Sequence, residues 1–412
     1  MRTRKTLFAS VLSLLALAGQ TALAQYGGPT GAYGDGMGPP PAYQAGYNPY
    51  ANYGLAQQAS AQEPTPAGQA PAAAAPLAAE MGAAGCDACG GAGCDACSDS
   101  CCPPCIVDPM CAGSFLSKWG VFGEFMYLRA RNADINYGTP FNGPVVPGTP
   151  PVQAGRQGIL DPDFAPAFRV GAYIPVDDET QIMVAYSRYE NTTNDAIAIN
   201  APNLITSTLV HPGSAAANTN FLNATGAWNI NWQFLDVDYR HIFFCTPQTR
   251  LNFVAGLRLA DFEQRLDTVY TNGGTTDTVN TDVDFFGAGP RLGLEALRLH
   301  YNNRLFAYGN GHVSFVGGEF RADYLQTSTA DPIVAQTFYS NGRIVPMLDL
   351  ELGVGWMSRC QNIQLRTGYL ISSWYNTVRT DNFINGVRNN NMQDLSRAMS
   401  FDGLTARATV MW

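Results

Sequence analysis

The chain has 412 residues, of which 14% are charged, and its formal net charge is −9. Nucleic-acid phosphates bind basic surfaces, so no nucleic-acid partner is expected for such an acidic chain. The 42 glycines and 26 prolines are unevenly spread, which favours one large β unit with a tail. After Leu128 no apolar run reaches the roughly 18 residues that a membrane-spanning helix needs.

Residues 1–24 are predicted to be a signal peptide. Three basic residues precede an apolar run from Leu7 to Leu17, and the stretch Ala-Leu-Ala at 22–24 follows it. This order is typical of a secretory signal with its cleavage site, and the apolar run is too short to span a bilayer. Its removal leaves 21 Lys and Arg against 33 Asp and Glu, a formal net charge of −12. We therefore predict an exported, acidic protein.

Two segments separate the signal peptide from the main unit. Residues 25–85, rich in Ala, Pro, Gly and Tyr, lack periodicity and are predicted to form a disordered tether. Residues 86–114 form a Cys-rich segment in which the block Gly-Cys-Asp-Ala-Cys occurs twice. An oxidising compartment favours disulfides or intermolecular cross-links there, with a four-thiolate zinc site or a redox-active Cys-x-x-Cys pair as alternatives. The disulfide candidates are Cys86, Cys89, Cys94, Cys97, Cys101, Cys102, Cys105 and Cys111, with Cys245 and Cys360 farther along the chain.

Residues 115–412 consist of long segments in which apolar and polar side chains alternate, as in β-strands. In the last segment, Leu404, Ala406, Ala408, Val410 and Trp412 share one face, opposite Gly403, Thr405, Arg407 and Thr409. Ten such segments are expected, over residues 119–131, 164–176, 180–190, 228–244, 250–266, 283–299, 304–326, 338–357, 362–375 and 399–412. They are longer than the roughly 5 or 6 residues of an ordinary globular strand.

The links between these segments alternate in length. The links at 177–179, 245–249, 300–303 and 358–361 are short, whereas the others are long, the longest spanning 191–227. Outer-membrane barrels have tight periplasmic turns and extended external loops. The sequence therefore predicts an all-β fold, a transmembrane antiparallel up-and-down β-barrel of about 10 strands (range roughly 8–14) over residues 115–412.

Charged side chains recur on the face opposite the aliphatic one, so they are predicted to face the barrel lumen. They are Glu124, Arg169, Asp236, Asp238, Arg240, Arg258, Arg291, Glu295, Asp349, Glu351, Arg366 and Arg407. An apolar core would not tolerate so many, because an isolated buried charge costs several kcal/mol. Two interpretations stay open: a water-filled channel with opposed charges at its constriction, or a lumen closed by a ladder of salt bridges. Glycines on the same face, such as Gly289, indicate a narrow, sharply curved barrel.

Tryptophan and cysteine positions give two further predictions. Trp119, Trp356 and Trp412 at inner strand ends, and Trp228 and Trp374 at outer ends, are predicted to form two membrane girdles. Cys245 and Cys360 fall in periplasmic turns four strands apart, well beyond the ~7 Å Cα separation that a disulfide allows. Their partners are therefore expected in the Cys86–Cys111 cluster or in a neighbouring molecule.

No enzymatic activity is predicted. The four histidines, His211, His241, His300 and His312, have neither a nucleophile-elbow serine or cysteine nor a second histidine at metal-ligand spacing. We expect no catalytic residue, no metal site and no cofactor.

The stretch 119–131, Trp-Gly-Val-Phe-Gly-Glu-Phe-Met-Tyr-Leu-Arg-Ala-Arg, and the stretch 286–295, Phe-Gly-Ala-Gly-Pro-Arg-Leu-Gly-Leu-Glu, carry a family resemblance. They resemble the pore-forming outer-membrane proteins related to the Legionella major outer-membrane protein, in the form abundant in planctomycetes. The resemblance implies a β-barrel pore in the outer membrane of a diderm bacterium, often with Cys-rich cross-linking.

Two functions are expected from these observations. The first is passive diffusion of small hydrophilic solutes through a charged lumen, by a protein in contact with outer-membrane lipid. The alternative is a structural envelope protein with a closed barrel as its anchor, linked by disulfides to copies of itself or to another envelope protein.

Overall fold

A computed structural model of the chain describes residues 116–144, 150–212, 220–300, 304–358 and 361–412. The predicted signal peptide (1–24), tether (25–85) and Cys-rich segment (86–114) lie outside the described residues, as does Cys360. Among the described residues, no helix is both long and apolar enough to cross a bilayer.

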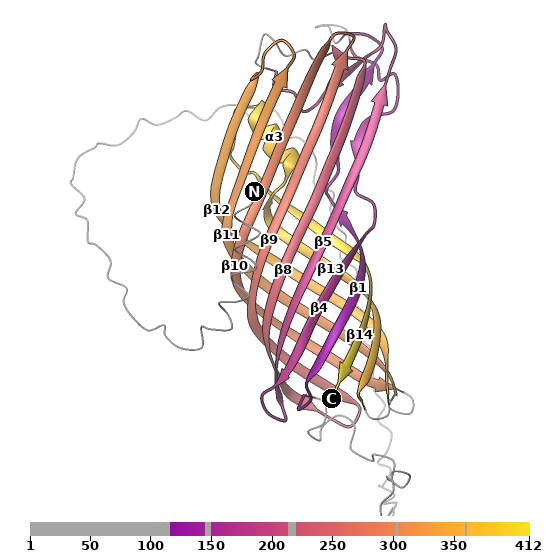
Figure 1. The fold of residues 1–412 in the computed structure, drawn as a ribbon, viewed down its shortest axis with the longest axis vertical. Coiled ribbons are helices and arrows are strands. Elements are labelled where there is room, and N and C mark those ends of the chain that lie inside the picture. The colour runs from indigo at the N-terminus through magenta and orange to yellow at the C-terminus, as the bar shows by residue number, and fades with distance from the viewer. Residues whose placement is uncertain (1–115, 145–149, 213–219, 301–303, 359–360) are drawn as a thin grey trace, which may run out of the picture. The chain divides into compact units, whose positions relative to one another are not determined.

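Ten strands form a closed barrel in which every neighbouring pair is antiparallel, which confirms the predicted fold (Figure 1). Around the ring the order is β1-β14-β13-β12-β11-β10-β9-β8-β5-β4. The barrel strands are β1 (Gly120–Arg131), β4 (Ala165–Pro175), β5 (Thr180–Ala198), β8 (Asn223–Cys245), β9 (Thr249–Asn272), β10 (Thr275–His300), β11 (Leu305–Ser328), β12 (Ala335–Met357), β13 (Ile363–Val378) and β14 (Ser396–Met411).

The first and last strands close the ring. β1 and β14 pair from Gly120↔Met411 to Arg131↔Ser400 without a register shift. Inward glycines allow close approach of the strands: a Cβ at Gly403 would lie 1.9 Å from Tyr127 O, and one at Gly289 would lie 1.8 Å from Phe315 O. This agrees with the narrow barrel predicted from the inward glycines.

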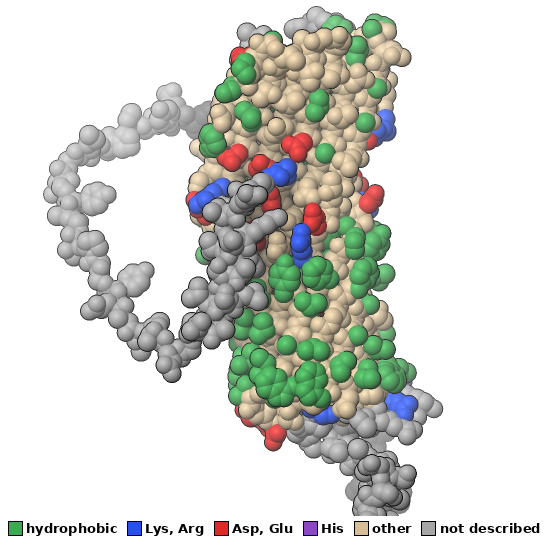
Figure 2. Space-filling view, in the orientation of Figure 1, with side chains coloured by type: hydrophobic (Ala, Val, Ile, Leu, Met, Phe, Trp, Pro, Cys, Tyr) green, Lys and Arg blue, Asp and Glu red, His purple; other side chains and the backbone are tan. Residues whose placement is uncertain are grey.

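The two faces of each strand meet different surroundings. On β10 the outward positions from Phe286 to Ala296 are all apolar, and Asp284 and Arg298 bound them on the two sides. This apolar belt covers ten residue steps, or about 33 Å along a strand, which at a tilt near 45° gives roughly the 25 Å height of a barrel's lipid-facing band. Figure 2 shows hydrophobic side chains gathered over the lower half of the visible face, with charged side chains above them.

The outer end of the barrel differs from the predicted succession of long loops. The predicted loop between residues 267 and 282 is wrong: β9 and β10 continue to a tight turn at Gly273 and Gly274, where Gly273 has a φ of +60°. In this extension Val269 faces outward and Val279 faces the lumen. The hydrogen bonds between β9 and β10 pair the backbone N–H and C=O groups of the extended residues.

Three of the outer links carry secondary structure. β2 (Ile135–Phe141), β3 (Gly158–Leu160), β6 (Leu204–Ser207) and β7 (Asn220–Phe221) form a small sheet in the order β3-β2-β6-β7. The Tyr270 hydroxyl of β9 donates to Tyr137 O of β2 at 2.7 Å, which ties this sheet to the inner wall of the barrel. Burial, together with a hydrogen bond to Asp195, raises the pKa of Tyr137 above its usual value. The third link holds helix α3 (Thr380–Arg388), which the alternation pattern did not predict.

The structure corrects the predicted outer girdle. Trp119, Trp356 and Trp412 face outward and are 52%, 37% and 64% exposed, as predicted for the inner girdle. Trp228 and Trp374 lie inside the barrel, 2% and 1% exposed, so their assignment to a lipid-facing girdle was wrong. The reason is that side chains alternate between the two faces of a strand, so residues an even number of positions apart share a face. Trp228 is eight positions from the inward Asp236, and Trp374 is eight positions from the inward Arg366.

Cys245 ends β8 at the same end of the barrel as the start of β1, and it is disulfide-bonded. All other cysteines lie outside the described residues. Its predicted pairing with the Cys86–Cys111 cluster or with a neighbouring molecule stays a prediction.

Placement of the apolar belt is testable on β10. Leu292→Arg is expected to lower the free energy of unfolding by about 2–4 kcal/mol, because Leu292 faces lipid near the middle of the belt. Asn280→Arg, outward on the same strand but beyond the belt, is expected to change it by less than about 1 kcal/mol. Urea titration in lipid vesicles, followed by tryptophan fluorescence, measures both variants. Equal losses would contradict this placement.

Candidate functional site in the barrel lumen

Side chains fill the lumen in three successive layers. An outer apolar layer is built from aromatic residues and helix α3, a charged layer occupies the middle, and an inner apolar layer lies near the start of β1. The inner apolar layer consists of Leu116, Leu297, Leu299, Phe306, Tyr308, Met357 and Met411. The lumen is therefore closed in this structure.

The outer apolar layer centres on Trp374. Its ring centroid lies 4.6 Å from that of Phe401, 5.3 Å from Phe262 and 5.3 Å from Phe234. Its indole Nε1 donates to Ser372 Oγ at 2.8 Å, so the one polar atom of the ring is satisfied. Such tilted and edge-on ring contacts each stabilise the fold by about 0.5–1.5 kcal/mol beyond area burial.

Helix α3 completes this layer from the outer side. Phe383, Ile384 and Val387 lie on one helical face and are buried in the same apolar cluster. Gln264 of β9 anchors the start of the helix: its Nε2 donates to Val378 O at 2.9 Å, and its Oε1 accepts from Thr380 Oγ1 at 3.2 Å. A short helix of this kind depends on its buried apolar face for stability.

Arg258 of β9 is the centre of the charged layer and is 1% exposed. Its Nε donates to Asp236 Oδ1 at 2.7 Å, its Nη2 to Asp236 Oδ2 at 2.9 Å and its Nη1 to Asp349 Oδ2 at 2.8 Å. Asp236 lies on β8 and Asp349 on β12, which is not a neighbour of β9. This guanidinium therefore spans part of the lumen and joins strands that are three positions apart around the ring.

Arg291 of β10 adds a second link to the same carboxylates. Its Nη1 lies 3.0 Å from Asp236 Oδ2 and 3.4 Å from Asp349 Oδ2, and its Nε lies 3.4 Å from Asp238 Oδ2. Two guanidinium groups thus pair with three carboxylates, which lowers the cost of burying these charges.

A second group of charges lies around Glu295. It pairs with Arg240, and Asn252 Nδ2 donates to its Oε2 at 3.3 Å. His312 Nε2 lies 3.9 Å from Glu295 Oε1, within ion-pair but not hydrogen-bond distance.

A third group joins the closing strands. Glu124 of β1 accepts from Arg407 Nη2 of β14 at 2.7 Å and from Arg169 Nη1 of β4 at 3.2 Å. The Arg407 guanidinium also lies 4.5 Å from the centroid of the Phe122 ring. These contacts link the strands on both sides of β1.

Glu351 and Arg366 complete the layer. Glu351 accepts from Tyr308 at 2.7 Å and from Thr405 at 3.1 Å. Arg366 lies 5.3 Å over the Tyr308 ring and donates to Gln364 at 2.9 Å. Aromatic faces therefore replace carboxylates as partners where the charge layer meets the inner apolar layer.

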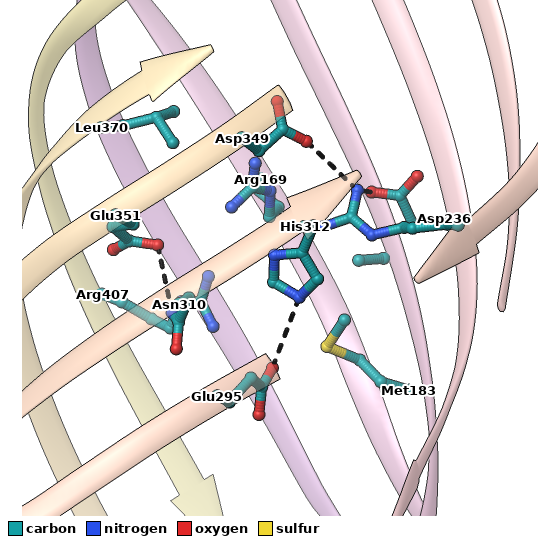
Figure 3. A pocket seen from close by; sticks show the side chains of 12 residues that line it. Arg169, Met183, Asp236, Glu295, Asn310, His312, Asp349, Glu351, Leu370 and Arg407 are labelled. Atoms are coloured by element: carbon teal, nitrogen blue, oxygen red, sulfur yellow. Dashed lines mark hydrogen bonds and ion pairs between the residues drawn. The ribbon is translucent and has the colours of Figure 1, made fainter. Parts of the chain in front are cut away.

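One cavity of about 30 Å³ lies among these groups (Figure 3). His312, Glu295 and Asn310 line it together with Asp236, Asp349 and Arg407. A cavity of this size holds one or two waters and excludes an organic solute. It can therefore hydrate the charges but cannot by itself conduct solutes.

In the structure, all twelve charges predicted to face the lumen lie on the inward faces of their strands. The sequence left open either a water-filled channel or a lumen closed by salt bridges. The structure has the second arrangement, with one apolar layer on the outer side of the charged layer and another on its inner side. Sequence reasoning missed the inward Arg250, which is 3% exposed, and the lumen position of His312. The alternation of side chains identifies both positions as inward. Arg250 is an even number of residues from the inward Arg258, and His312 is an even number from the inward Ser314.

Comparison with known proteins places this chain among outer-membrane proteins. Residues 114–410 match the family described as Legionella pneumophila major outer membrane protein precursor. None of the curated proteins matches the chain.

Solved structures share the barrel at low sequence identity. The outer membrane protease OmpT from Escherichia coli is 11% identical, with a TM-score of 0.39, and the alignment covers 72% of this chain and 97% of that one. The Pseudomonas putida toluene transporter TodX is 10% identical, with a TM-score of 0.32 and coverage of 71% and 89%. At these values neither likeness carries a functional argument.

Burial of the charged layer is testable at Arg258. Arg258→Ala is expected to lower the free energy of unfolding by about 3–5 kcal/mol, because Asp236 and Asp349 would stay buried without it. The control is Arg265→Ala on the outward face of β9, where an ion pair with Asp282 is expected to contribute less than about 1 kcal/mol. Urea titration in vesicles compares the two, and similar small losses would show that water screens the charged layer.

Proposed function

Because the chain belongs to the family of the Legionella pneumophila major outer membrane protein, we propose that it is a structural protein of the outer membrane. Its filled barrel serves as an anchor that holds the Cys-rich N-terminal segment at the periplasmic side. The observation that carries this proposal is the closed lumen, where two apolar layers enclose a cavity of about 30 Å³. We assign no enzymatic activity and no cofactor to it.

The inner end of the barrel supports the anchoring role. Leu116 packs in the inner apolar layer, and Trp119 lies at the inner edge of the lipid-facing surface, so the chain enters the barrel at this end. Cys245 lies at the same end. A disulfide from the N-terminal cysteines to Cys245 or to a neighbouring copy would therefore form on the periplasmic side, where the compartment is oxidising.

The anchor proposal predicts two results for the purified full chain. Planar bilayers are expected to show no conductance steps, with or without reductant, while an open porin reconstituted in parallel does conduct. Non-reducing electrophoresis is expected to show multimers that collapse on reduction. Conductance steps in the untreated protein, or monomers alone under non-reducing conditions, would contradict the proposal.

A second candidate is passive diffusion of small hydrophilic solutes after the apolar layers move aside. Buried polar atoms of the charged layer favour it: Asp238 Oδ1 and Oδ2, Asn252 Oδ1 and His312 Nε2 have no hydrogen-bond partner among the described residues. Unsatisfied buried polar atoms cost about 1–3 kcal/mol each, and a hydrated lumen would remove that cost.

This candidate is separated from the first by opening both apolar layers. The double variant Phe383→Asp, Leu116→Asp places one charge in each layer and is expected to give conductance steps if the charged layer is a solute path. The control double variant Asn385→Asp, Asn362→Asp adds the same two charges at exposed positions near the two ends of the barrel, and it is expected to give no conductance steps. Heat-modifiable electrophoretic mobility checks that both variants are folded, and a folded, silent double variant would leave the anchor as the function.

A further inference from the structure

We propose that the inner rim of the barrel binds an anionic phospholipid at β10–β13, with the phosphate on Arg298 and His300 and an acyl chain in an adjacent groove. The groove has a volume of about 650 Å³. Its outward-facing walls are Leu305, Ala307, Val354, Trp356, Leu365 and Thr367. This inference is independent of whether the lumen conducts.

The groove lies within the lipid-facing surface. Its lining residues are cross-strand neighbours: Leu305 of β11 is opposite Trp356 of β12, and Trp356 is opposite Leu365 of β13. Ala307, two residues farther along β11 and opposite Val354, has a small side chain that leaves a hollow in the surface there. An apolar hollow in the lipid-facing belt is in contact with acyl chains, since no water reaches it.

The basic groups lie on β10 along the edge of the same groove. His300 lines it and is opposite Leu305, while Arg298 is opposite Ala307. Both side chains are exposed, and Arg298 is the first outward charge below the apolar belt on β10. One lipid molecule can therefore contact the basic pair with its phosphate and the groove with its chain.

The partners of the arginines distinguish this rim from the rest of the barrel. Several exposed arginines above the belt form ion pairs, as in Arg131–Asp402, Arg188–Glu190 and Arg321–Glu319. Of the arginines that the structure describes, Arg298 and Arg304 alone have no hydrogen-bond or ion-pair partner for the side chain among the described residues. An exposed, unpaired guanidinium is suited to bidentate binding of a phosphate.

The depth of these groups matches the phosphate level of the inner leaflet. Trp356, 37% exposed, marks the inner interface beside the groove, as interfacial aromatics do. Basic residues at an anionic membrane surface attract its headgroups. The ligand class is therefore a phospholipid with net negative charge, such as phosphatidylglycerol, rather than a zwitterionic one.

Native mass spectrometry of the full chain in detergent, with phosphatidylglycerol or phosphatidylcholine of the same acyl chains as probes, tests the proposal. Phosphatidylglycerol is expected to bind about tenfold more tightly, and the double variant Arg298→Gln, His300→Gln is expected to lose that preference. Arg188→Gln, an exposed arginine of β5 above the belt, is the matched control and should keep it. Ala307→Trp, which fills the groove, is expected to weaken binding of both lipids.

Four results would overturn the proposal. These are equal binding of the two lipids, an unchanged preference in the Arg298/His300 variant, displacement of the lipid by inorganic phosphate at equal concentration, or a dimer that Ala307→Trp dissociates in the absence of lipid. The last would identify the groove as a contact between two copies of the chain. Heat-modifiable mobility confirms that each variant is folded.

Discussion

The structure depends on the requirement that every backbone N–H and C=O within lipid be paired. A sheet meets it only by closing on itself, and here the closing pair is β1 with β14. Closure fixes two surroundings for each strand, lipid outside and a lumen of set width inside. The apolar belt, the charged lumen and the positions of the rims all follow from that division.

The width of the lumen determines what the inward charges do. With ten strands, Arg258 on β9 reaches Asp349 on β12, so side chains from strands three positions apart around the ring meet inside the lumen. Charges that would line a water-filled channel in a wider barrel instead pair with one another. The aromatic layer around Trp374 and the inner layer around Phe306 keep bulk water away from them, which strengthens these ion pairs.

Arginine has three different roles on this barrel, according to its position. Inside, arginines balance buried carboxylates; above the belt they form exposed pairs such as Arg131–Asp402; below it, Arg298 lies at the rim next to an apolar groove. The arginines of these outer pairs thus find carboxylates within the protein, whereas Arg298 has none among the described residues. This asymmetry gives the two ends of the barrel distinct surfaces.

Alternation by itself determined the ten strands, their order along the chain and the inward face that holds charges such as Glu124 and Arg407, because side-chain direction in a strand has a period of two residues. The same period places Trp228 and Trp374 inside, although both lie near strand ends, where lipid-facing tryptophans are expected. The filling of the lumen was decided only by the tertiary structure. Which inward side chains meet depends on the barrel's width and on segments such as α3, whose contacts with Gln264 join residues more than a hundred positions apart. No local pattern encodes those distances.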